Sequence, residues 1–191
     1  MGQDKKPHKF IATTMREYLN EQTLLLNSKF DSIKEGITAY HRSPIKFDKF
    51  DISKVSNNKN RQLSGWGIYF SNFIPDKEYG EYLYKVNLFK DKKGYILIDT
   101  RNPVQEDIVN KVVEALGGHN KKSDEVVEFS YVGWLFYNTL SRILGGDKKA
   151  SLFLLKNGVD GLKRNIAKDS NDYVLFSDEH ITIGGIEYDP Y

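Results

Sequence analysis

The chain of 191 residues contains no cysteine, two methionines, two tryptophans and five prolines. The lack of cysteine excludes disulfide bonds, thiolate nucleophiles and cysteine-ligated zinc. No apolar stretch reaches the roughly 18 residues that a membrane-spanning helix requires. A net charge of +2 provides no general electrostatic attraction to nucleic acid. These absences leave a globular protein of about one domain, large enough to bury a core without crosslinks.

The first ten residues, MGQDKKPHKF, are polar and lack the apolar segment of a signal peptide. We therefore expect a cytoplasmic protein. Residues 1–9 are expected to form a disordered tail and residues 10–191 a single domain. Apolar residues at helical spacing between Phe10 and Leu26 predict a helix at the start of that domain.

The remaining pattern changes from strand to helix and back, which predicts an α+β fold. Short alternating or apolar stretches predict strands at residues 36–41, 65–71, 81–89, 94–99, 159–164, 172–177 and 180–183. The turn at residues 91–94 predicts a hairpin between two of these strands. Helical spacing with Gly-Gly or Gly stops predicts helices at residues 104–116, 126–144 and 147–157, together a helical insert at about 103–157. A short helix is expected at 75–79 and a long surface loop at 43–64.

The aromatic content is high, with twelve tyrosines and eleven phenylalanines, which suits a dense β core or a site that stacks on a flat ligand. His41 ends a predicted strand, where it is either a hydrogen-bonded core residue or a functional one. Asp172 begins a strand, as a solvated strand end or as a carboxylate pointing into a cleft. No histidine and acidic residue share ligand spacing on a helix, so we expect no metal.

The segment GWGIYFS (residues 65–71) lacks the third glycine or the Gly-Lys-Ser/Thr ending of a phosphate loop. Its glycines instead allow the backbone to approach something flat. Tyr69, in the middle of this segment, is either a core aromatic of a strand or a stacking residue.

Three segments carry a resemblance to a known family through their order. They are YHRS (40–43), GWGIYFS (65–71) and NDYVLFS (171–177). Together they resemble the ADP-ribosyltransferase superfamily, on the His-Tyr-Glu branch of diphtheria-type toxins and poly(ADP-ribose) polymerases. The stretches FDKFD (47–51) and LLKNGVDGLKR (154–164) are similar to compact ADP-ribosyltransferase-like domains of phage polyvalent proteins. The resemblance spans about residues 37–184 and implies a split mixed β-sheet that binds NAD in a bent form.

The resemblance also implies roles for individual residues. His41 would hydrogen-bond the adenosine-side ribose, and Ser43 with the main chain of Arg42 would hold the nicotinamide amide. Tyr69 would stack on the nicotinamide ring, while Asp172 would stabilise the oxocarbenium-like ribose and orient its 2′-hydroxyl. Further NAD-binding positions implied by the matched segments and the residues after them are Tyr40, Gly67, Phe70, Ser71, Tyr79 and Tyr82.

Two positions depart from the family pattern. Arg42 stands where the family has glycine, so its side chain must point away from nicotinamide or toward a phosphate. Asp172 replaces glutamate and is about 1.5 Å shorter in reach, and a shift of that size can cost about 10²-fold in rate. Glu179, further along the chain, is an alternative carboxylate.

We therefore expect a toxin-like mono-ADP-ribosyltransferase of prokaryotic or phage type, with NAD as co-substrate and no metal. Its acceptor would be a macromolecule, protein rather than nucleic acid, and the protein would act as a monomer in the cytoplasm, the host's if a phage encodes it. Three other interpretations stay open: an NAD- or ADP-ribose-binding relic that acts through a protein partner, a 2′-phosphotransferase-type RNA enzyme, and a plain α+β interaction domain.

Overall fold

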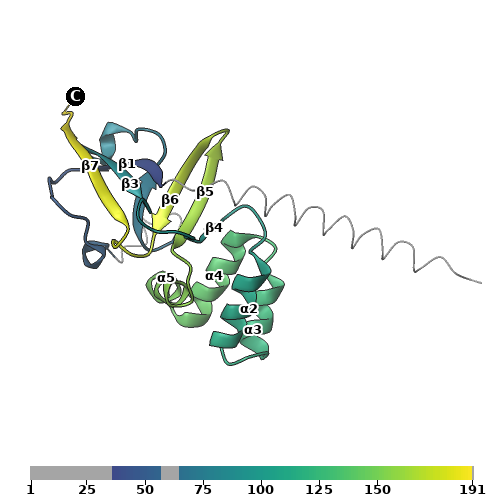
Figure 1. Ribbon diagram of the computed structural model, residues 1–191. Helices are drawn as coiled ribbons and strands as arrows, with labels where there is room; N and C mark the ends of the chain where they lie inside the picture. The colour runs from purple at the N-terminus through teal and green to yellow at the C-terminus, as the bar shows by residue number, and fades with distance from the viewer. Residues whose placement is uncertain (1–35, 57–64, 191) are drawn as a thin grey trace, which may run out of the picture. The chain divides into compact units, whose positions relative to one another are not determined.

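Seven strands form a mixed sheet in the order β4-β5-β6-β2-β1-β3-β7 (Figure 1). The computed structural model describes residues 36–56 and 65–190. The predicted tail (1–9) and N-terminal helix (10–26) lie outside these residues. The strands are β1 (Ile37–Ser43), β2 (Ile68–Ser71), β3 (Tyr82–Leu88), β4 (Leu97–Asp99), β5 (Gly161–Ala167), β6 (Ser170–Leu175) and β7 (Ile181–Tyr188). The α+β class predicted from the sequence is confirmed.

The predicted hairpin at residues 91–94 is wrong. Strand β3 pairs with β1 and β7, whereas β4 lies at the opposite edge of the sheet and pairs with β5 in parallel. The turn expected at 91–94 is instead part of a connection that carries the chain across the sheet. A parallel pair needs a long crossover, and the helices between β4 and β5 provide it.

Four α-helices lie between β4 and β5 and cover one part of the sheet, beside β4, β5 and β6 (Figure 1). They are α2 (Glu106–Ala115), α3 (Lys121–Glu128), α4 (Gly133–Leu144) and α5 (Asp147–Lys156). Short 3₁₀ turns, η1 (Ile52–Lys54) and η3 (Lys77–Tyr79), occur in the long loop and before β3.

The single helix predicted at 126–144 is also wrong. Residues 129–132 are not helical and separate α3 from α4. Gly133 N donates to Asn102 O at 2.8 Å, and Val104 N donates to Ser130 O at 2.8 Å. A Cβ at Gly133 would lie 2.2 Å from Asp99 O. The break therefore docks the first turn of α4 against the chain that leaves β4, a contact that the helical periodicity of the sequence does not reveal.

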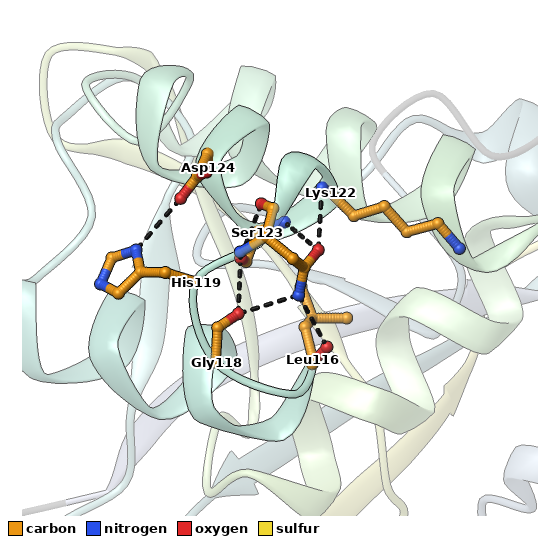
Figure 2. A network of polar contacts seen from close by, with 7 residues as sticks. Leu116, Gly118, His119, Lys122, Ser123 and Asp124 are labelled. Carbon is orange, nitrogen blue, oxygen red and sulfur yellow. Dashed lines mark hydrogen bonds and ion pairs between the residues drawn. The ribbon is translucent and has the colours of Figure 1, made fainter.

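A dense cap sets the start of α3 (Figure 2). The Asn120 side chain accepts hydrogen bonds from Lys122 N and Ser123 N, and Ser123 Oγ accepts one from Asn120 N. This reciprocal arrangement is a capping box, which satisfies backbone donors that an α-helix leaves unpaired. Ser123 Oγ also donates to Gly118 O at 2.7 Å, so the cap fixes the turn between α2 and α3.

Alternation along the strands produces two hydrophobic clusters on opposite faces of the sheet. One cluster joins the helices to Ile98 of β4, Leu162 of β5 and Val174 of β6. The other contains Phe70 of β2 and Tyr84 of β3, and residues of the long loop pack against it. The sheet is thus covered on both faces, by helices on one and by the loop after β1 on the other.

Candidate functional site

The three segments that carry the family resemblance lie on neighbouring strands at the centre of the sheet. YHRS forms the end of β1, IYFS forms β2, and NDYVL lies within β6. Strand β2 pairs with β6 over four residues, but a single residue pair, Tyr40 opposite Ser71, connects β2 to β1. Backbone pairing is therefore long on both sides of this junction and one residue pair long across it, where a contact of 2.8 Å between His41 Nδ1 of β1 and Tyr69 O of β2 adds a second connection.

Polar residues form a row across four strands at this junction. Arg164 of β5 lies opposite Asp172 of β6, Asp172 opposite Ser71 of β2, and Ser71 opposite Tyr40 of β1. Side chains directly opposite each other on paired strands share a face of the sheet. We call Arg164, Asp172, Ser71 and Tyr40 the polar row.

Asp172 is the centre of the polar row. Its Oδ1 accepts a hydrogen bond from Ser71 Oγ at 2.6 Å, and its Oδ2 forms an ion pair with Arg164 Nη2 at 2.7 Å. The Asp172 side chain is 15% exposed and that of Arg164 is 38% exposed. The carboxylate is thus oriented by two partners from two strands and remains reachable from solvent.

Arg164 is a site residue that the sequence analysis missed. It belongs to β5, eight positions before Asp172, and the two strands form an antiparallel hairpin with Asp169 at its turn. Counting back from the turn would place Asn165 opposite Asp172, but a shift in register between Asn165 and Ala167 places Arg164 there instead. The hairpin pattern in the sequence therefore does not indicate this cation.

His41 lies on the face opposite the polar row. Its ring contacts Phe47, Phe50, Phe70 and Tyr84, with ring centroids 5.2–6.3 Å apart. Nδ1 lies 2.8 Å from Tyr69 O, and because a carbonyl can only accept, Nδ1 carries the proton. Burial lowers the pKa of His41, partly offset by that hydrogen bond. The structure therefore holds a neutral imidazole among aromatic rings.

Tyr69 shares the face of the polar row, packed against the helical cluster. Its hydroxyl donates to Gly65 O at 2.6 Å. Gly67 sits where a Cβ would lie 2.4 Å from Leu175 O, so this glycine permits close contact between β2 and β6. Packing of β2 against β6 therefore explains why residue 67 is glycine. Phe70 lies on the same face as His41 and is buried against Phe50.

Arg42 has a different environment from the glycine it replaces in the family pattern. Its buried guanidinium donates to Pro75 O at 2.8 Å and to Gly80 O at 3.2 Å, and pairs with Asp189 at 2.8 Å. The side chain therefore joins β1 to the loop before β3 and to the residue after β7. Ser43 Oγ accepts from Ile45 N at 3.1 Å, which forms a local turn after β1.

The other predicted residues lie at the periphery. Tyr79 is 60% exposed in η3, and the Tyr82 ring packs against Tyr188 with centroids 5.1 Å apart. Glu179, the alternative carboxylate, is exposed in the turn between β6 and β7. The structure thus brings Tyr40, Tyr69, Ser71 and Asp172 to one face of the central strands, and places His41 and Phe70 on the other.

A hollow of about 430 Å³ adjoins the end of the polar row. Tyr40 and Lys85 line it on one side, and Ile186 and Glu187 of β7 on the other. Gly185 lies opposite Lys85 and has no atom within 4 Å of the position of a Cβ, so its missing side chain helps to form the hollow.

Within residues 36–56 and 65–190, no group of three or more histidine, cysteine, aspartate or glutamate side chains is placed to hold a metal ion. No helix in the same part of the chain is both long and apolar enough to cross a membrane.

Comparisons with known proteins provide one distant match. No protein-family model matches the chain, and no curated protein matches it. The crystal structure of an anti-CRISPR protein superposes with a TM-score of 0.38 and 10% sequence identity, over 78% of this chain and 95% of the other. A TM-score this low does not establish a shared fold.

Proposed function

We propose that the chain is a mono-ADP-ribosyltransferase that moves ADP-ribose from NAD to a macromolecular acceptor and releases nicotinamide. The observation that supports this most is the convergence of three distant segments on β1, β2 and β6, with a single residue pair across the junction of β1 and β2. The family resemblance implies a split sheet, and a junction with one backbone residue pair is compatible with it. NAD would bind at that junction, with Asp172 as the carboxylate that acts on it.

The chemistry assigned to Asp172 follows from its charge and exposure. Cleavage of the glycosidic bond builds positive charge on the ribose, and a fixed carboxylate stabilises such charge without reorganising. Ser71 orients Asp172 through a 2.6 Å hydrogen bond, and Tyr40 and Tyr69 lie on the same face of the sheet. Water or an acceptor side chain would then attack the ribose. The acceptor is proposed to be a protein, and the enzyme a monomer.

The test is nicotinamide release from NAD by the purified protein, with and without cell lysate. Asp172→Asn removes the charge while keeping the size, and we expect a loss of release of at least about 10²-fold. Asp169→Asn is the matched control: it removes the same charge three residues away, and asparagine tolerates the φ of 62° at that position. Equal release by both variants would reject the catalytic role of Asp172.

The dependence on lysate separates transfer from hydrolysis. Release that requires lysate, together with label from adenylate-labelled NAD in a protein fraction, would identify a transferase with a protein acceptor. Release without lysate would identify an NAD glycohydrolase that uses the same carboxylate. No binding of NAD by calorimetry would reject both activities.

A second candidate is a domain that binds NAD or ADP-ribose without turning it over and acts through a protein partner. Two observations favour it: Arg164 forms an ion pair with Asp172, and the His41 ring lies on the opposite face of the sheet from Asp172. Asp172→Glu discriminates the two candidates. Turnover by this variant, with binding but no turnover in the parent protein, would support the binding domain.

A further inference from the structure

The Asp172 carboxylate accepts hydrogen bonds from two side chains of different chemistry, Ser71 and Arg164. Ser71 Oγ donates to Oδ1, and a serine hydroxyl can rotate and instead accept from a new donor. Arg164 Nη2 contacts Oδ2, and a guanidinium can only donate and always carries its charge. Ser71 can therefore accommodate a ligand hydroxyl at Asp172, whereas Arg164 competes with it.

The charge of Arg164 opposes the task proposed for Asp172. A positive charge 2.7 Å from the carboxylate repels any second positive charge that develops beside it. The two residues are fixed opposite each other by the β5–β6 register, so the ion pair is built into the hairpin. It occupies Oδ2 of the carboxylate from the β5 side, while Ser71 contacts Oδ1 from the β2 side, nearer the junction where NAD is proposed to bind.

The environment of Arg164 indicates that it can leave this position. Its Nε is buried without a hydrogen-bond partner, so the guanidinium makes a one-point contact with Asp172 in place of the two-point contact that arginine and carboxylate prefer. Its side chain is 38% exposed. An ion pair with these features is weak enough to open and close in solution.

We propose that Arg164 is a positioning residue that withholds Asp172: the ion pair closes the carboxylate to a ribose hydroxyl, and only the fraction of molecules in which the pair is open is competent. The inference rests on the proposed binding of NAD at the β1–β2 junction. A site that is competent only part of the time binds with an affinity reduced by that fraction. Removal of Arg164 should therefore increase the contribution of the hydrogen bond between the ribose hydroxyl and Asp172 to the affinity for NAD.

The experiment compares the binding of NAD with that of an NAD analogue lacking the 2′-hydroxyl of the nicotinamide ribose, by calorimetry. In the unaltered protein we expect the two dissociation constants to be similar, because Asp172 is engaged. In Arg164→Gln we expect NAD to bind about fivefold more tightly than the analogue, the ratio that corresponds to a partly exposed ion pair. In the double variant with Asp172→Asn, the preference should disappear.

Lys163→Gln is the matched control, because it removes one positive charge from the adjacent position of β5. Lys163 lies opposite Tyr173, on the other face of the sheet from Asp172. We expect it to leave the ratio unchanged. Arg164→Lys keeps the positive charge, so we expect NAD and the analogue to bind this variant with nearly equal dissociation constants. Thermal unfolding of each variant verifies that the fold is intact.

The outcomes separate the inference from the function on which it rests. NAD bound with the same ratio in the unaltered protein and in Arg164→Gln would overturn the withholding role and leave the binding site standing. A preference for NAD in the unaltered protein that Arg164→Gln abolishes would show that Arg164 presents Asp172 rather than withholds it. No binding of NAD by any variant would reject the proposed function, and the inference with it.

Discussion

Neighbouring residues of the central strands pack as apolar core on one face of the sheet and form polar contacts on the other. On one face, His41 and Phe70 pack with three other aromatic rings, and the only polar link of the His41 ring among the described contacts is its hydrogen bond to Tyr69 O. On the other face, Ser71 and Asp172 form a chain of hydrogen bonds with Arg164. Burial of apolar area dominates the stability of the first face, whereas partly exposed polar contacts contribute little to stability. On the second face, the residues of the polar row stay partly exposed and can therefore meet a ligand.

The largest effect that tests this comparison is expected from Phe70→Ala. Phe70 is 2% exposed and its ring packs on His41 and Phe50. Removal of a buried phenylalanine leaves a cavity and costs about 3–5 kcal/mol of unfolding free energy. Urea unfolding followed by circular dichroism measures the loss. A loss below about 1 kcal/mol would mean that the aromatic face is not a core.

A second effect concerns Arg42, which lies on the same face of β1 as Tyr40 and has a buried side chain. Arg42→Met keeps the apolar stem but removes the donors to Pro75 O and Gly80 O. We expect a loss of about 1.5–3 kcal/mol, because two partly buried carbonyls and the Asp189 carboxylate lose a charged donor. The same urea titration measures it. Unchanged stability together with altered NAD affinity would instead assign Arg42 to ligand binding.

A third prediction uses pH to distinguish the faces. Because burial lowers the pKa of His41, the folded protein keeps this ring neutral where the unfolded chain, with a pKa of about 6.5, takes up a proton. The unfolding free energy should therefore fall as pH decreases below about 6.5, by at most about 1.4 kcal/mol per pH unit. Unfolding free energies measured between pH 5 and pH 8 test this.

His41→Asn is the variant that isolates this titration. The asparagine amide nitrogen can donate to Tyr69 O in place of Nδ1 but does not titrate. The fall between about pH 6.5 and pH 5 should disappear. The pKa of Asp51, lowered by hydrogen bonds from Ser53, concerns a separate range below about pH 4, where the loss should persist in the variant. A pH dependence retained by His41→Asn near pH 6 would assign it to another group.

The smallest effect is expected from Ser71→Ala, next to Phe70 on the same strand but on the other face. It removes the hydrogen bond to Asp172, while Arg164 still pairs with the carboxylate. We expect a loss of about 0.5–1 kcal/mol. Phe70→Ala and Ser71→Ala change adjacent residues of β2, so the difference between their losses of unfolding free energy compares the two faces directly. A loss as large as that of Phe70→Ala would show that the polar row is a structural core rather than a site.

Much of the local structure could be predicted from the sequence. Alternation identified β3, and the glycine stops identified the ends of α4 and α5, because side-chain period and glycine φ are local properties. The end of β7 was predicted too early, at residue 183, because Gly184 and Gly185 interrupt the apolar pattern. The strand continues to Tyr188, since its pairing with β3 resumes after an irregularity. The break before α4 was missed because apolar residues continue through residues 126–134, although Ser130 and Gly133 interrupt them.

The candidate site was predicted only in part. Ser71 and Asp172 were named from the family resemblance, and they do meet, but their contact depends on the β2–β6 register. The same resemblance named His41, which the structure turns to the aromatic face. A shift of one residue in register moves every side chain to the other face, so motif letters alone do not determine which face a residue takes.

The sequence by itself determined the α+β class, the positions of most strands and helices, the absence of cysteine chemistry and the order of the three matched segments. Only the tertiary structure decided that β4 pairs with β5, that Arg164 faces Asp172, and that the backbones of β1 and β2 pair at a single position. The physical reason is that period and propensity act over a few neighbouring residues. Strand partners are chosen by contacts between residues far apart in the chain, which depend on how the whole sheet buries its two faces.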